Sequence, residues 1–400
     1  MFKDNLLQQS HQTVSAAAAE VLNNLRKARE GAGISQEALG KQLNLGPGWI
    51  ESFEVGASAL DLETLLVLTQ GIGVNPAALF VELDGSDKYR SKSKSELFVR
   101  RCLRASQVGN DVLVHFDYGK FDASYLLHGA SVSEFEEVTA VLRNELSKLV
   151  LVANKSDLDL NQIKSDAVCV SFLKAVELWP ELNPSDLWWF VIYRAYCDPY
   201  NHPAQFARLS FEQSWKRAGG WALEKILVSH YRDAFAAHGL SIEIPYGRRK
   251  DMLTEQILVD TRLEKDKIDV FLLGPDDTVF GVVNVKASFA ERRTDDVPLS
   301  EALIRAGYYS PLWTMDCKST PGEWPINRGE LGATSGKRSA KRKDFEDDGS
   351  FSACFSYNQN TQSTVSVDTV KAPVICCNFE DPNDEFLKSA LRAWSLFSKA

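Results

Sequence analysis

The sequence of 400 residues lacks the features of several protein classes. It contains no apolar run long enough to cross a membrane, and its first residues lack the apolar core of a secretory signal. Its seven cysteines are odd in number and scattered, with no CxxC pair, which argues against a disulfide framework and a zinc site. We therefore expect a cytoplasmic protein that has no membrane association.

Basic residues do not predominate either. The chain holds 45 Lys and Arg against 54 Asp and Glu, a net charge of −9. This balance argues against non-specific adhesion to nucleic acid, but a local basic cleft remains compatible with it, because phosphate contacts depend on where the charges lie.

The composition that remains is that of an ordinary globular protein, with 44% hydrophobic and 25% charged residues. Its length suggests two or three domains. We predict an all-α domain at 1–82, a polar linker at 83–97, and a larger domain at 98–400. The larger domain would comprise a helical subdomain (98–210) and a core (211–400).

Residues 268–309 carry the strongest pattern in the chain. Two short apolar strands, Ile268–Leu273 and Val279–Val285, are joined by the turn sequence GPDD. An amphipathic helix follows and is predicted to begin at Pro298. This order brings Asp269, at the first strand, near Lys286, at the end of the second.

Glu301, in the first turn of the predicted helix, completes a group of two carboxylates and one amine. Such a group suits metal-dependent phosphodiester hydrolysis. The carboxylates of Asp269 and Glu301 would hold Mg²⁺, which prefers oxygen ligands, and Lys286 would orient the attacking water or screen developing charge. Each feature alone is common: Asp269 and Lys286 could be a solvated pair, and Glu301 a favourable charge at a helix start.

The combined pattern resembles the restriction endonucleases of the PD…(D/E)xK superfamily, more narrowly those that read CCGG or a site built on CC and GG. Most of the superfamily has an acid two residues before the lysine, and here that residue is Asn284. In the CCGG group a glutamate from the following helix replaces it, and Glu301 fits that replacement. The group also has an acidic residue followed by arginine five residues after the lysine, matched by Glu291 and Arg292.

The resemblance implies an α/β (α+β) fold, a restriction-endonuclease-like mixed sheet flanked by helices. It also implies a Mg²⁺-dependent Type II enzyme that acts on double-stranded DNA as a homodimer, with pairing of dimers into a tetramer left open. Such nucleases often begin their core with a helix whose glutamate faces the metal. Glu224, in the long predicted helix 211–238, is the candidate, and a surface charge pair with Lys225 is the alternative.

Three stretches with basic residues are candidates for DNA contact. Glu291 can accept from cytosine N4 and Arg292 can donate twice to guanine, so the pair, with Arg293 beside it, could read a C·G step. Phosphate positioning is the expected role of a basic run before the hairpin: Arg248, Arg249 and Lys250. In the low-complexity stretch 333–349, the basic residues from Lys337 to Lys343 are expected to form a mobile loop that orders against DNA, and a simply solvated stretch is the alternative.

The N-terminal segment resembles the helix-turn-helix domain of the lambda-repressor/Cro type. The matching residues are Leu25, Arg29, Ile34, Ser35, Gln36, Leu39, Leu43, Ile50, Phe53, Glu54, Gly56 and Leu65. In that family the front of the third helix reads base edges, but here it is the donor-poor sequence LGPGW. Gln36 is a candidate phosphate contact, and a module for dimer contacts or packing is the alternative.

Our hypothesis from the sequence is a Type II restriction endonuclease. Two other functions stay open: a helix-turn-helix transcriptional regulator with a C-terminal sensing or dimerisation domain, and a structure-specific repair nuclease. The pattern leaves the outer bases of the recognition site undetermined, and also whether a base pair separates its CC and GG halves.

Overall fold

A computed structural model gives the structure of the protein. It describes residues 21–55, 62–74, 76, 79, 101–118, 121–152, 157–203, 206, 210–259, 268–289, 293–318, 326–332 and 338–399. The chain divides into two compact units, Met1–Cys102 with Ala204–Arg208 and Leu103–Pro203 with Leu209–Ala400. The linker predicted at 83–97 lies outside the described residues.

The first unit is helical in its described part. Residues 21–31 form a helix, followed by α2 (Gln36–Gln42), α3 (Trp49–Glu54) and α4 (Leu62–Ile72). The Ser35 side chain caps α2 by accepting from the Ala38 amide, as the sequence predicts. Apolar side chains from each helix meet in one core: Val21, Leu22, Leu25, Ala28, Leu39, Ile50, Phe53, Leu65, Leu68, Ile72 and Leu79.

The second unit opens with a three-stranded antiparallel sheet, β1 (Arg104–Val108), β2 (Asp111–Tyr118) and β3 (Phe121–Leu127). The weak polar–apolar alternation of residues 111–128 is consistent with β2 and β3. Helices α5 (Val132–Ser147) and α6 (Asp157–Leu178) follow and pack against each other.

An aromatic stretch connects these helices to the rest of the unit. It comprises α7 (Pro184–Asp186), the π-helical turn η4 (Leu187–Ile192) and α8 (Tyr193–Cys197). Trp188, Phe190 and Tyr196 are fully buried. This aromatic stretch therefore forms core rather than a base-stacking surface.

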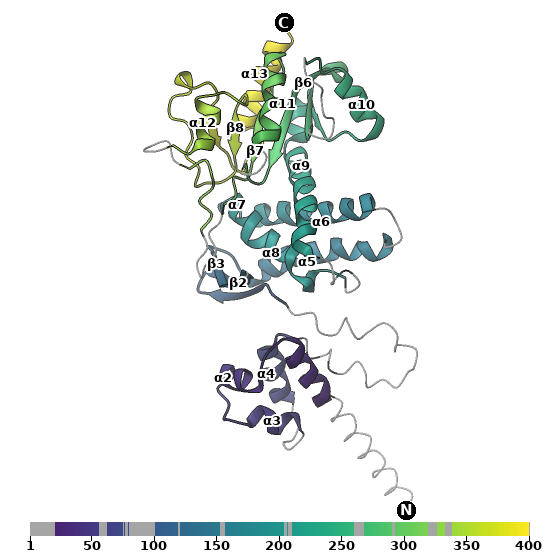
Figure 1. Ribbon diagram of the computed structural model, residues 1–400, viewed down its shortest axis with the longest axis vertical. Helices are drawn as coiled ribbons and strands as arrows, with labels where there is room; N and C mark the ends of the chain where they lie inside the picture. Colours follow the sequence, from purple (N-terminus) through teal and green to yellow (C-terminus); the bar gives the residue numbers. More distant parts are fainter. Residues whose placement is uncertain are drawn as a thin grey trace, which may run out of the picture. The chain divides into compact units, whose positions relative to one another are not determined.

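The long helix α9 (Phe211–Ala237) joins this helical part to the main sheet. It packs on α6 at one end and on β4 and β6 at the other, as Figure 1 shows. The helix is continuous through Gly219 and Gly220, as expected for the long helix predicted at 211–238. A Cβ on Gly219 would lie 2.9 Å from the Trp215 ring, so the missing side chain makes room for that indole.

The main sheet has six strands in sequence order, β4 (Ser241–Glu243), β5 (Val270–Leu273), β6 (Val279–Lys286), β7 (Leu312–Thr314), β8 (Cys354–Ser356) and β9 (Val374–Cys376). The first three pair antiparallel and the last four pair parallel, so the sheet is mixed. Helices α10 (Gly247–Glu255), α11 (Arg293–Arg305), α12 (Ala340–Glu346) and α13 (Glu385–Phe397) lie between or after the strands. The predicted mixed sheet flanked by helices is thus confirmed.

The predicted hairpin of residues 268–285 corresponds to β5 and β6. The turn between them places Asp276 and Asp277 at positive φ, which short polar residues tolerate. The helix after the hairpin begins earlier than expected. Pro298 suits a first turn because it lacks an N–H, yet α11 starts at Arg293 and includes Pro298 in its interior. In the part of the chain that the structure describes, no helix combines the length and apolarity needed to span a bilayer.

Candidate active site

The β5–β6 hairpin brings together the two groups that the sequence singles out. Asp269 immediately precedes β5 and Lys286 is the last residue of β6. Because Val270 pairs with Val283, the two side chains reach the same end of the hairpin. The Lys286 ammonium donates to Asp269 Oδ2 at 2.9 Å, and the Val285 amide donates to the same oxygen at 2.9 Å.

A second carboxylate approaches Lys286 from helix α11. Asp296 Oδ2 lies 3.8 Å from the Lys286 ammonium, and the Asp296 side chain is only 6% exposed. Lys286 therefore lies between Asp269, just before β5, and Asp296, on α11. The sequence predicts the same arrangement, but with Glu301 as the acid on the helix. Asp296 was not among the predicted site residues.

Glu301, the helix acid that the sequence predicts for this group, makes other contacts among the described residues. It lies five residues after Asp296, about 140° further around the helix. It contacts Arg305, at 3.8 Å, and the Ser350 hydroxyl, at 3.4 Å. Because α11 begins at Arg293 rather than at Pro298, Asp296 also lies on this helix and is the acid found beside Lys286.

Asn284 occupies the strand position at which most of the superfamily has an acid. The structure shows which contacts its side chain makes instead. Asn284 is buried, and its amide donates to the Ser310 hydroxyl at 3.2 Å. Ser310 also bonds Ser300 of α11 at 2.8 Å. Asn284 thus helps to hold α11 against the sheet, and an ionised acid there would carry an uncompensated charge.

Glu224 reaches the same group from α9. Burial first, and then the negative charge of Asp269, raise the pKa of Glu224 to about 8, although Lys286 and Lys250 act in the opposite direction. Lys225 does not pair with Glu224, because its ammonium lies 2.8 Å from Ser165 and forms an ion pair with Asp166 on α6. Glu224 accepts no hydrogen bond within the described ranges.

These groups define the carboxylate cluster: Glu224, Asp269, Asp296 and Lys286. A half-buried carboxylate without a donor, beside a second carboxylate, has unbalanced negative charge that a cation would compensate. The donors are all oxygens, which suits a hard divalent ion. Among the described residues no three or more Asp, Glu, His or Cys side chains are arranged so that they could together hold a metal ion. This is compatible with Mg²⁺, which commonly uses one or two carboxylates, substrate phosphate and water.

The basic residues before the hairpin have separate roles. Arg249 forms ion pairs with Glu243 and Asp277, each at 2.8 Å. Its charge therefore stabilises local structure and is not free for phosphate. Arg248 is exposed. Lys250 donates to the Ile268 carbonyl at 3.1 Å, next to Asp269.

Other candidate DNA contacts are placed less favourably or lie outside the described part. Glu291 and Arg292 are not among the described residues, and Arg293 is described only as the first residue of α11. In the first unit the Gln36 amide donates to Glu54 at 2.8 Å, so this group is already used internally.

The basic stretch at 337–343 was expected to be a loop that orders against DNA, but from Ala340 onward it belongs to α12, and Arg338, Lys341 and Arg342 form ion pairs within the protein. Arg342 is fully buried and lies 2.9 Å from Glu346, while Lys341 lies 2.6 Å from Glu330. Much of its positive charge is therefore neutralised internally.

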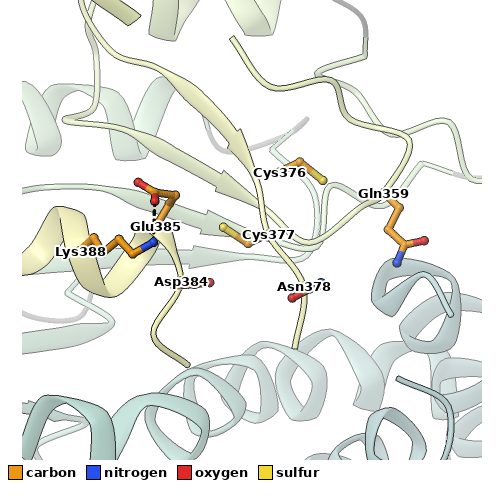
Figure 2. Close-up of a pocket in the computed structure, with 7 residues that line it drawn as sticks. All are labelled: Gln359, Cys376, Cys377, Asn378, Asp384, Glu385 and Lys388. Atoms are coloured by element: carbon orange, nitrogen blue, oxygen red, sulfur yellow. Dashed lines mark hydrogen bonds and ion pairs between the residues drawn. The ribbon is translucent and has the colours of Figure 1, made fainter. Parts of the chain in front are cut away.

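A separate pocket of about 290 Å³ lies where the ends of β8 and β9 meet the start of α13 (Figure 2). Its lining is Gln359, Cys376, Cys377, Asn378, Asp384, Glu385 and Lys388. Burial raises the pKa of the thiols of Cys376 and Cys377, so both stay protonated and poorly nucleophilic near neutral pH. No member of the carboxylate cluster lines this pocket.

Comparison with known proteins gives the family. No family model matches the chain. The chain is 33% identical over 289 residues to the Type II restriction enzyme AgeI of Thalassovita gelatinovora, which covers 68% of this chain and 95% of that enzyme. The crystal structure of the specific AgeI–DNA complex superposes with a TM-score of 0.60 at 29% identity, over 70% of this chain and 99% of that one. The restriction-endonuclease-like fold is thus confirmed, and the chain belongs to the Type II restriction endonucleases, which are site-specific deoxyribonucleases.

Proposed function

We propose that this enzyme cleaves both strands of DNA at a palindromic CCGG-containing or related CC/GG site, with Mg²⁺ as cofactor, and leaves 5′-phosphate ends. Restriction endonucleases generally use divalent metal ions, and the carboxylate cluster supports that use here. The observation that carries the proposal is the open carboxylate of Glu224 beside Asp269, with Lys286 in contact with Asp269.

Asp269 and Glu224 are the residues that would hold the ion, with Asp296 in the position that the sequence had given to Glu301. When bound, Mg²⁺ would neutralise phosphate charge and make a bound water more acidic. The ion would also favour the ionised form of Glu224, whose pKa is otherwise raised.

Lys286 would position the attacking water and screen charge that develops on the phosphate. Its ammonium is held by Asp269 and Asp296, which fixes its direction. In the in-line reaction, the water oxygen forms a bond to phosphorus and the bond from phosphorus to the 3′-oxygen breaks. The 3′-oxygen leaves as a hydroxyl, and the phosphate stays on the 5′ end.

Sequence readout is assigned to Glu291 and Arg292 on the chemistry of their side chains, with Arg293 beside them. A homodimer is proposed because a palindromic site has the two-fold symmetry of such a dimer. Tetramer formation stays open.

The first unit is proposed to be a helix-turn-helix module of the lambda-repressor/Cro type. Gln36 donates to Glu54, and Arg29 donates two hydrogen bonds to the same carboxylate, at 2.6 and 3.0 Å. These bonds leave Gln36 fewer donors for phosphate. They support a role in dimer contacts or packing over base reading.

The direct experiment is digestion of plasmids that carry or lack a CCGG site, with and without Mg²⁺, followed by end mapping. We expect discrete fragments with 5′-phosphates only when both site and metal are present. Cleavage of branched DNA without a site would favour the repair-nuclease alternative, and an inert protein at every salt concentration would contradict the proposal.

A further inference from the structure

Two exposed cations have neighbouring backbones beyond the end of strand β7. Lys318 comes four residues after Thr314, the last residue of that strand. Arg328 belongs to the next described segment, 326–332. The Arg328 amide donates to the Lys318 carbonyl at 3.1 Å, and both residues are exposed.

This place adjoins the edge of the sheet that carries the carboxylate cluster. Strands β6 and β7 are parallel and end together at this edge. Their alignment continues past the strands, because the Met315 amide donates to the Lys286 carbonyl at 3.2 Å. The Cys317 amide likewise donates to the Ala287 carbonyl at 2.9 Å.

The path from Lys286 to Lys318 is therefore short. One strand spacing and four residues of chain separate their Cα atoms, which places them within about 20 Å of each other. A DNA site of six base pairs is also about 20 Å long. One bound duplex can thus reach the carboxylate cluster and the two cations together.

Buried polar groups hold the backbones of the two cations in place. Asn327 is buried, and its side-chain oxygen accepts from the Lys318 amide at 2.8 Å. The nitrogen of the same side chain donates to Ser185 at 2.7 Å and to Asp186 at 3.0 Å, both on α7. These bonds connect the segment that carries Arg328 to the helical part of the second unit.

Asp316 anchors the chain on the other side of Arg328. Its buried carboxylate accepts from the Glu330 amide at 2.6 Å and from the Leu331 amide at 3.3 Å. Gly329, at a φ of +67°, lies between, and a Cβ there would be 2.4 Å from Asp316 Oδ2. The segment is thus fixed before any ligand binds, which lowers the entropic cost of binding.

Neither cation has a side-chain partner among the residues that the structure describes. By contrast, Lys225, Arg249 and Lys341 all form ion pairs with acids. Two neighbouring positive charges repel each other, so their placement together does not stabilise the fold. Anionic groups bound beside them would offset the repulsion, and DNA is the polyanion on which this family acts.

We propose that Lys318 and Arg328 bind neighbouring phosphates of one DNA strand, within the site that the carboxylate cluster cleaves. Lysine contacts phosphate as a point charge and arginine through two N–H groups. Phosphate contacts fix the register and orientation of a duplex, so this pair positions the cleaved phosphate against the cluster. The inference rests on the proposed function of that cluster.

The test is DNA binding by the full-length enzyme without metal, measured by fluorescence anisotropy at several salt concentrations. The probes are a duplex that contains CCGG and a scrambled duplex of equal length. Lys318→Gln and Arg328→Gln should each reduce the slope of log affinity against log salt by about one, and the double variant by about two. The loss should be equal on both duplexes, because phosphates carry no sequence information.

Lys216→Gln and Arg217→Gln are the matched controls. Both residues are exposed on α9. They adjoin Trp215, whose ring packs on those of Tyr193 and Tyr196 in α8. These variants remove the same two charges elsewhere, so the salt slope should stay at the wild-type value. Urea unfolding of all four variants should match the wild type.

Cleavage of a CCGG plasmid by the wild-type enzyme with Mg²⁺ separates the inference from the proposed function. If the plasmid is cut but the double variant keeps the wild-type slope, the inference is wrong and the proposed function stands. If the slope falls as expected but no plasmid is cut, the phosphate contacts are right and the proposed function is wrong. A loss confined to the CCGG duplex would indicate base reading and contradict phosphate binding.

Discussion

Two groups of buried acids in this enzyme have similar pKa shifts and very different surroundings. Burial raises the pKa of Asp186 and of Asp316 to about 6, and it raises that of Glu224 to about 8. Asp316 accepts from the Glu330 amide at 2.6 Å and from Thr361 at 2.8 Å. Asp186 likewise accepts from a tyrosine and an asparagine.

Glu224 accepts nothing from the described residues, and its neighbour Asp269 is balanced by a lysine. A raised pKa alone therefore does not separate the proposed metal-binding acid, Glu224, from the structural acids Asp186 and Asp316. The difference lies in hydrogen bonding. Asp186 and Asp316 each accept hydrogen bonds from several donors, whereas the carboxylate of Glu224 remains available to a ligand. The following experiments test this difference.

Loss of Lys286 should have the largest effect. Lys286→Ala removes the ammonium that contacts Asp269 and Asp296, and we expect cleavage to fall by about 1000-fold or more, because that charge acts on the transition state. Binding to cognate duplex, measured by gel shift, should persist. Equal loss of binding would show that Lys286 serves only to hold the fold.

Asp296 and Glu301 provide a matched pair on one helix. Asp296→Asn should reduce cleavage by about 100-fold, whereas Glu301→Gln, whose side chain is 41% exposed, should change it less than threefold. Plasmid cleavage rates under identical Mg²⁺ conditions decide the matter. The reverse ranking would restore the assignment made from the sequence.

Cation binding should depend on pH through Glu224. Its raised pKa means that a proton must leave before the carboxylate can bind a cation, so affinity for Mg²⁺ should rise with pH up to about 8 and then level off. Below about pH 8 the affinity for Mg²⁺ should rise by about tenfold for each pH unit. Calorimetric titrations at pH 6.5, 7.5 and 8.5 measure it, and Glu224→Gln should abolish the slope.

Asp316 should affect stability rather than cleavage. Its folded pKa of about 6 exceeds the usual value near 4, so its contribution is present at low pH and is lost as pH rises from about 4 to 6. The expected loss in free energy of unfolding is about 2–3 kcal/mol. Urea unfolding of wild type and Asp316→Asn across this range should show a difference that varies with pH, and a constant difference would contradict the pKa shift.

The smallest effects concern the two neighbouring arginines. Arg249→Ala removes a partly exposed ion-pair brace and should cost at most about 1 kcal/mol of stability, with little change in the salt dependence of DNA binding. Arg248→Ala should leave stability unchanged and reduce the slope of log affinity against log salt by about one. Interchanged results would reverse the two roles.

The sequence predicted the hairpin well because its signals are local. Two continuous apolar runs and a turn cluster determine β5 and β6, and they place Asp269 and Lys286 at one end of the hairpin. The sequence did not indicate the proximity of Asp296 to Lys286, since the start of α11 depends on packing against the sheet, which Pro298 obscures.

Other features of the site cannot be predicted from the sequence alone, because they depend on tertiary contacts. That Arg249 is held by Glu243 and Asp277 follows only from the fold, because residues 243 and 277 are far apart in the chain. The same holds for Gln36 and Glu54 in the first unit. A run of basic residues therefore shows which charges exist, and tertiary contacts decide which of them face solvent.

The bonds between Asn284, Ser310 and Ser300 have a consequence for newly made enzyme. Because the strand carries an amide, the hairpin alone supplies Asp269 and Lys286 but no further acid. Asp296 joins this pair only after α11 packs against the sheet, and Glu224 joins it only after α9 does so. A half-folded chain would thus be harmless to the chromosome of the cell that makes it, since three separate segments must assemble before the catalytic group is complete.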